Sequence, residues 1–280
     1  MGRWPGEPRF ATCRLRFPVT TPIFICLSDA VCSASGFDDF RRITALLTFH
    51  AIHPDIRQPV RADTAALGRL PISAFQYCEA LRTASALGWY VFPPTEFSLY
   101  FDGKEVFIAD DGEWRALRTE PLPAEYEADW STRYEASYGP CPSMLTDFTD
   151  TGIVQVFTGL FVSSSPGAWC HIRPLVNIHV KSSYWCYEGI VETDSFTPMP
   201  LFVNIHLTRT NSEIYFPSEF PLFQVSCVPS SILSLNREAG SGSVFDDDFP
   251  KEGLTQTLRR QAGQRIPAGQ YGTGVRKRRK

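Results

Sequence analysis

The sequence contains no uninterrupted run of about 18 apolar residues, so no membrane-spanning helix is expected. None of its eight cysteines stands in a Cys-x-x-Cys pair, which leaves a zinc ribbon or a thioredoxin-type redox site without support. An even count would permit disulfides, but a chain of 280 residues can bury a sizeable core without them. We therefore expect most of the cysteines to be free thiols.

Common catalytic signatures are also missing. The sequence contains no P-loop, no glycine-rich dinucleotide loop and no Gly-x-Ser-x-Gly elbow. It has neither a His-x-His nor a His-Glu-x-x-His motif, so we predict no metal site and name no cofactor. Whether the chain is an enzyme stays open at this level.

Charge is low overall but unevenly placed. The formal net charge of −3 argues against a surface that attracts nucleic acid generally. From Lys251 to Lys280, however, there are nine Lys or Arg residues and one acid, Glu252, a net of about +8 that leaves the remainder near −11. Nucleic acid or anionic lipid is therefore expected only at this basic tail, the alternative being a solvated, disordered end.

Three segments follow from the pattern along the chain. Residues 1–42 show no sustained periodicity, and Pro18 and Pro22 interrupt a short apolar patch that would otherwise resemble a signal peptide. We predict a disordered or extraneous N-terminal extension over 1–42, one mainly β domain over 43–232, and a disordered basic tail over 233–280.

The central segment predicts a mainly β fold, a sandwich or a distorted barrel, with one clear helix before the sheet. The helix is expected in "PISAFQYCEALRTASALG", with Ser73 as N-cap, Gln76 completing a capping box and Gly88 after the end. Next, "FSLYFDGKEVFIAD" predicts a hairpin whose turn is Asp102-Gly103. From Thr151 on, short apolar runs recur at regular spacing, as is typical of a sandwich or barrel.

Several stretches in order resemble an uncharacterised bacterial family, known only as a domain of unknown function. They are "ALGWYVFPP", "FTGLFVSSSPGAWCHIRPLVN", "EGIVETDSF", "NIHLTR" and "EFPLFQV", within residues 43–229. The resemblance implies no activity. It leaves the first forty or so residues and the tail outside, which is consistent with their being extensions.

A fainter similarity points to the β-clip fold of deoxyuridine triphosphatases and deoxycytidine triphosphate deaminases. In that fold a Ser-Gly loop holds phosphates, a hairpin reading roughly Gly-x-Ile-Asp takes base and sugar, and a later strand carries a Gln. Here "SSSPG", "EGIVETD" and "FPLFQV" occur in that order, and "AGQYGTGVRK" resembles a Gly-rich arm. The chain departs from the pattern because the loop lacks its Arg and Glu192 stands where the Asp is expected, unless Asp194 serves.

The candidate site centres on two acids at the end of a strand-like run. Residues two apart in a strand point to the same face, so Glu192 and Asp194 are predicted to present two carboxylates together. Such a pair can raise one pKa or bind a cation, while the alternative is that both face water at a strand end. The other candidates for ligand binding are Arg173, Asn177, Glu188, Asn204, His206 and Gln224. Arg173 can bind a carboxylate or phosphate, or form an ion pair with Glu188 or Glu192.

These observations predict a cytoplasmic protein that binds or processes a small polar molecule. The first alternative is a nucleotide hydrolase of the β-clip type, and the second is a structural or interaction module without a ligand. The oligomeric state is not predicted.

Overall fold

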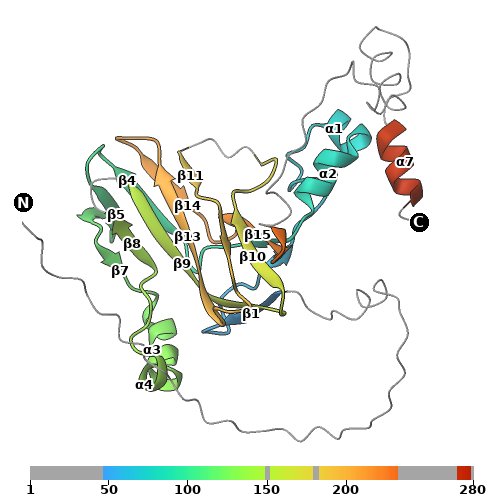
Figure 1. Cartoon of the computed structure of the whole chain (residues 1–280). Helices are drawn as coiled ribbons and strands as arrows, with labels where there is room; N and C mark the ends of the chain where they lie inside the picture. The colour runs from blue at the N-terminus through green and yellow to red at the C-terminus, as the bar shows by residue number, and fades with distance from the viewer. Residues whose placement is uncertain (1–46, 149–151, 179–182, 233–269, 279–280) are drawn as a thin grey trace, which may run out of the picture. The chain divides into compact units, whose positions relative to one another are not determined.

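The structure, a computed structural model, describes residues 47–148, 152–178, 183–232 and 270–278 (Figure 1). The predicted extension over 1–42 and most of the predicted tail lie outside the described residues. No helix among the described residues is long and apolar enough to cross a membrane.

The described chain is mainly β, as predicted, with every strand pair antiparallel and no closed barrel among the described strands. The first sheet has the order β11 (Tyr184–Cys186), β13 (Met199–Leu207), β9 (Ile153–Ser164), β8 (Leu145–Phe148) and β7 (Thr119–Glu120), with β1 (Leu47–Ala51) also paired to β9. The second has the order β12 (Gly189–Val191), β10 (Ala168–Arg173), β15 (Phe223–Pro229), β3 (Trp89–Val91) and β2 (Val60–Arg61). The third has the order β14 (Glu213–Phe216), β4 (Phe97–Phe101), β5 (Val106–Asp110) and β6 (Glu113–Ala116).

One hydrophobic core receives side chains from all three sheets. Alternate residues of a strand point to opposite faces of the sheet. Strand β13 illustrates how the sequence directs side chains into the core. Its buried residues Leu201, Val203, Ile205 and Leu207 belong to the core, whereas the residues between them are only partly buried. The alternation therefore leaves Asn204 and His206 on the outward face.

The predicted hairpin is confirmed, with a longer loop than expected. Leu99 lies opposite Ile108 and Phe101 opposite Val106, so four residues connect β4 to β5. The loop is held by Asp102, whose Oδ1 accepts hydrogen bonds from the backbone N–H groups of Lys104 and Glu105, each at 2.7 Å. A side chain that closes its own turn in this way replaces the two-residue Asp-Gly turn that the sequence predicted.

The single predicted helix is wrong in its details. Two short helices occur instead, α1 (Ile72–Tyr77) and α2 (Glu79–Ser85), separated at Cys78, and Pro71 rather than Ser73 precedes the first. The expected apolar face is largely exposed: 38% of Phe75, 37% of Leu81 and 48% of Leu87 is accessible. Helix α2 buries Glu79 and Ser85 instead, so polar contacts, not apolar periodicity, orient it.

Three further helices are described: α3 (Ala124–Arg133), α4 (Glu135–Tyr138) and α7 (Gln270–Arg278). Helix α7 lies within the segment predicted as a disordered tail. It buries Val275 and places Arg276 Nε 3.9 Å from Glu79 Oε2 on α2. The tail residues 233–269 and 279–280 lie outside the described residues.

Candidate functional site

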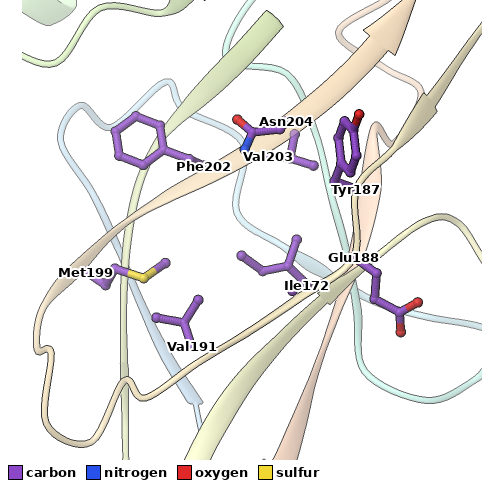
Figure 2. Close-up of a pocket in the computed structure, with 9 residues that line it drawn as sticks. Ile172, Tyr187, Glu188, Val191, Met199, Phe202, Val203 and Asn204 are labelled. Carbon is purple, nitrogen blue, oxygen red and sulfur yellow. The ribbon is translucent and has the colours of Figure 1, made fainter. Parts of the chain in front are cut away.

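A pocket of about 270 Å³ opens between the end of the second sheet and strand β13 (Figure 2). Drug-sized ligands usually occupy about 300 Å³ or more, while an apolar cavity of about 150 Å³ holds a benzene ring. The pocket therefore has room for one ring and a few substituents. Its lining is formed by Ile172, Tyr187, Glu188, Gly189, Val191, Met199, Phe202, Val203 and Asn204.

The interior of this pocket carries no charged group. Glu188 is the one charged residue of the lining, and its carboxylate points away from Asn204 and Phe202 in Figure 2. It accepts a hydrogen bond from His171 on β10, with 2.6 Å between Glu188 Oε1 and His171 Nε2. No Lys or Arg belongs to the lining. A phosphate bound there would have no cationic side chain to compensate its charge, which is costly. An uncharged molecule has no such cost.

Asn204 supplies the polar side chain of β13 at this pocket. Its Oδ1 accepts a hydrogen bond of 3.2 Å from Gln155 Nε2 on β9, the residue opposite it in the sheet. An Asn amide has two donors and an acceptor with two lone pairs, and the same holds for Gln. The Asn204 Nδ2 and Gln155 Oε1 groups therefore form an adjacent donor and acceptor with fixed orientation.

His171 connects Glu188 to the interior of the second sheet. Its Nδ1 lies 3.3 Å from the hydroxyl of Ser226, which is fully buried on β15. Because Ser226 is inaccessible, this Ser-His-Glu chain cannot present a nucleophile to a ligand. It fixes the imidazole and, through it, the Glu188 side chain.

Three predicted site residues lie together, but around the end of helix α2 rather than in the pocket. Gln224 is fully buried, donates from Nε2 to the carbonyls of Ser85 (3.1 Å) and Leu87 (2.7 Å), and accepts at Oε1 from the N–H of Val176 (3.2 Å). Arg173 Nη2 donates to the carbonyls of Ala84 and Leu87, at 3.2 and 3.1 Å. Burial lowers the pKa of the Arg173 guanidinium, and Glu188 opposes that shift.

Asn177 completes the same network. Its Nδ2 donates to the carbonyl of Leu81 at 3.2 Å and to the hydroxyl of Ser85 at 3.0 Å. The last carbonyls of a helix lack partners further along it, and these side chains supply hydrogen bonds there. The carbonyls of Leu81 and Ala84 also accept from Ser85 Oγ (2.9 Å) and the Leu87 N–H (3.4 Å). The structure thus gives Arg173, Asn177 and Gln224 contacts that hold α2 against the second sheet.

The predicted pair of carboxylates does not lie on a strand, so the reason for placing both on one face does not hold and the pair stays a prediction. Strand β12 ends at Val191, and the next residues form a turn in which the Glu192 carbonyl accepts from the N–H groups of Ser195 (3.1 Å) and Phe196 (2.8 Å). The same-face rule for strands does not apply in a turn. Asp194 instead accepts from the Gly167 N–H at 3.1 Å and from Trp169 Nε1 at 3.0 Å, which ties the turn to the β9–β10 connection. Glu192 is exposed.

His206 lies on the outward face of β13, next to aromatic rings rather than acids. The Trp185 ring on β11 meets it edge-on with 5.6 Å between centroids, and Tyr187 lies 4.1 Å from Trp185. Tryptophan is usually largely buried, yet 43% of Trp185 is exposed. His206 therefore belongs to an aromatic surface beside the pocket.

Thiol and metal chemistry find little support among the described residues. The described cysteines are free, and burial raises the pKa of both Cys170 and Cys186 to about 12. A thiol with so high a pKa is almost entirely protonated near neutrality and is a poor nucleophile. Within the described residues no group of three or more His, Cys, Asp or Glu side chains could hold a metal ion.

The sequence reasoning named Glu188 and Asn204 of the pocket and missed its apolar walls. The alternation in "MPLFVNIHL" was a usable signal for Phe202 and Asn204, since both fall on the outward face of β13. No pattern could have shown that β12 leaves the first sheet and pairs with β10, because that is a property of strand pairing over a distance.

Comparison with known proteins does not assign the chain. No family model matches it, so the resemblance to the uncharacterised bacterial family stays a prediction. No curated protein matches it either. Solved structures of phage dUTPases do resemble it, at very low identity. A mutant dUTPase from phage phi11 of S. aureus shows 11% identity and a TM-score of 0.34, over 73% of this chain and 99% of that one. A mutant dUTPase of Staphylococcus bacteriophage 80alpha shows 10% identity and a TM-score of 0.36, over 72% and 98%.

Proposed function

We propose that this chain binds a small uncharged molecule built on one flat ring in the pocket between β12 and β13. The observation that carries the proposal is the lining itself, which combines apolar walls, one amide and no inward-facing charge. The size supports a single ring, and the walls formed by Ile172, Val191 and Phe202 favour a flat apolar body.

Two kinds of polar group are placed to orient such a ring. The first is the Asn204 amide, already fixed by Gln155. The second is the backbone of β12, which is an edge strand of the second sheet among the described strands. An edge strand leaves some backbone N–H and C=O groups without partners in the sheet, although the Val191 carbonyl of β12 accepts from the N–H of Thr193 at 2.9 Å. A ring with both donors and acceptors on its rim, such as a nucleobase, matches these groups.

The expected affinity sets the conditions of the test. A ligand of about ten non-hydrogen atoms at about 0.5 kcal/mol each gains about 5 kcal/mol, which corresponds to a Kd of a few tenths of a millimolar. Nucleobases, nucleosides and other neutral ring compounds should therefore be screened at several millimolar. We expect at least one to raise Tm, because ligand binding to the folded state alone stabilises it.

Two neighbouring residues on β12 provide a matched pair of variants. Val191→Phe adds a ring inside the pocket, whereas Ile190→Phe adds it to the exposed residue opposite His171 on the other face. The first should abolish the ligand response and the second should retain it. Asn204→Ala removes the amide without filling space and should weaken binding about tenfold. No response to any ring compound, or a response that survives Val191→Phe, would refute the proposal.

A nucleotide hydrolase of the β-clip type is the second candidate, supported by one observation. The stretch Ser163–Gly167 covers the end of β9 and its connection to β10, whereas Glu188–Asp194 contains β12 and Phe220–Val225 contains the start of β15. Strand β10 pairs with both β12 and β15. However, Gln224 and Asp194 are committed to internal hydrogen bonds, which leaves Glu192 as the available carboxylate. Incubation with dUTP, dCTP and Mg²⁺ tests this candidate. Phosphate or pyrophosphate release that Glu192→Gln abolishes would establish it in place of simple binding.

A further inference from the structure

The outward face of the first sheet carries a row of side chains that crosses four strands. Trp185 on β11 lies opposite His206 on β13, which lies opposite Ile153 on β9, which lies opposite Phe148 on β8. We call these three aromatic residues, together with Ile153 between two of them, the aromatic row. At its two ends, 43% of Trp185 and 45% of Phe148 is exposed.

A polar row runs beside it. Asn204, Gln155 and Thr146 lie opposite one another on β13, β9 and β8, two residues along from the aromatic row. Side chains two apart in a strand share a face, so both rows face the same way. The face thus offers aromatic rings with amides and a hydroxyl immediately alongside. Tyr187 joins it to the pocket, because it contacts Trp185 and also lines the pocket.

The face carries no formal charge. None of the residues of the two rows is a Lys, Arg, Asp or Glu. Outside the basic tail the chain carries a net charge near −11, which repels polyanions. Nucleic acids owe much of their affinity to phosphate contacts with Lys and Arg, so single-stranded DNA or RNA would gain stacking here and no counter-charge.

We propose that this face binds a neutral saccharide. The face of an aromatic ring is electron-rich and attracts the partly positive C–H groups on the flat side of a sugar ring. Hydroxyl groups both donate and accept, as do the amides of Asn204 and Gln155. These amides are fixed by their mutual hydrogen bond of 3.2 Å, so little freedom is lost on binding.

The length of the aromatic row indicates the size of the saccharide. Three strand spacings of about 4.8 Å separate β11 from β8, or about 14 Å in all. A monosaccharide would cover one end only, whereas a di- or trisaccharide spans Trp185 to Phe148. The saccharide site goes beyond the pocket function proposed above and shares only Asn204 and Tyr187 with that pocket.

The test uses two tryptophans with nearly equal exposure on edge strands of different sheets. Trp185 on β11 is 43% exposed and Trp114 on β6 is 42% exposed. Binding of maltotriose, cellotriose and chitotriose to the full-length chain is measured by titration calorimetry, with each trisaccharide added to a final concentration of about 20 mM. At least one should bind, Trp185→Ala should weaken it at least tenfold, and Trp114→Ala should leave it unchanged. Trp185→Phe retains a ring and should restore part of the affinity, which separates loss of stacking from loss of folding.

Three other outcomes would overturn the proposal, and two of them would indicate a different binding partner for this face. Binding of an oligo-dT strand that depends on Trp185 would make the face a nucleic-acid surface. A dimer in light scattering that Trp185→Ala dissociates would make it an interface between copies of this chain. No binding of any trisaccharide, or equal losses in the Trp185 and Trp114 variants, would remove the site. Val191→Phe distinguishes the two proposals, because it should abolish ring binding in the pocket and leave saccharide binding intact.

Discussion

At the scale of single residues, two positions beside helix α2 control how closely it approaches the second sheet. Gly88 has a φ of +97°, and a Cβ added there would lie 1.8 Å from the carbonyl oxygen of Val225. Gln224 satisfies two carbonyls and one N–H at the same junction. One residue is required because it is small and the other because it is polar.

We predict that Gly88→Ala destabilises the fold by more than about 3 kcal/mol, because the backbone of β15 must move to admit the methyl group. Gly112→Ala is the matched control, since its φ of +86° is equally left-handed but no atom lies within 4 Å of the added Cβ. Gly112→Ala should lower the free energy of unfolding by only about 1 kcal/mol, because the left-handed backbone conformation is its one source of strain. Urea unfolding of both variants measures the difference, and equal losses would contradict the close approach.

For Gln224→Leu we expect a loss of about 3 kcal/mol. The new side chain is similar in size but leaves the Ser85 carbonyl and the Val176 N–H without the partner that Gln224 provides, each at a cost of about 1–3 kcal/mol before relaxation. The Leu87 carbonyl keeps its hydrogen bond from Arg173. Gln155→Leu, at a partly exposed position, should cost less than about 1 kcal/mol. A Gln224→Leu protein as stable as the wild type in urea would show that water satisfies these groups.

At the scale of elements, the β4–β5 hairpin depends on an ionised side chain in its loop. Hydrogen bonds from the N–H of Glu105 and then of Lys104 lower the pKa of Asp102 below its ordinary value of 3.8. A carboxyl group with a lowered pKa stabilises the folded state above its unfolded pKa, and that contribution is lost as the pH falls through the folded pKa.

The corresponding prediction concerns the difference in Tm between the wild type and Asp102→Ala. It should be constant from pH 7 down to about 5 and shrink below the ordinary carboxyl pKa as Asp102 becomes protonated. Asp102→Asn keeps an oxygen acceptor without charge, so its Tm at pH 7 should lie between those of the wild type and Asp102→Ala. A difference that grows on acidification would contradict the assigned hydrogen bonds.

At the scale of the whole molecule, the core of the described residues receives side chains from all three sheets. Residues 1–42 show no sustained apolar periodicity in the sequence, so a chain that lacks them is predicted to retain its fold. Its Tm should fall by less than about 5 °C, because a loss of 1 kcal/mol shifts a domain of this size by about 2–4 °C. Calorimetry of the shortened and full-length chains decides this, and a larger fall would show that the segment packs on the core.

The sequence could predict the structures that depend on residues close together in the chain. It could not predict those that depend on contacts between residues far apart in the chain. The hairpin around Asp102-Gly103 was predictable, because alternation and turn residues act within a few positions. The α1–α2 region was not, because its orientation depends on Arg173, Asn177 and Gln224, which are about 90 to 140 residues away along the chain. The same polar residues looked like ligand-binding groups, since a sequence does not reveal which buried backbone groups need partners.

The sequence by itself determined the mainly β class, the strand alternation and the uneven charge, because these depend on residue type and local period. Only the tertiary structure decided which side chains meet. It turned Asp194 toward Gly167 and Trp169, left Glu192 exposed, and separated β12 from β13 so that a pocket opens between them. It also placed Trp185, His206 and Phe148 in one row. The physical reason is that strand pairing joins residues without regard to their distance in sequence, so sites made across strands leave no local signal.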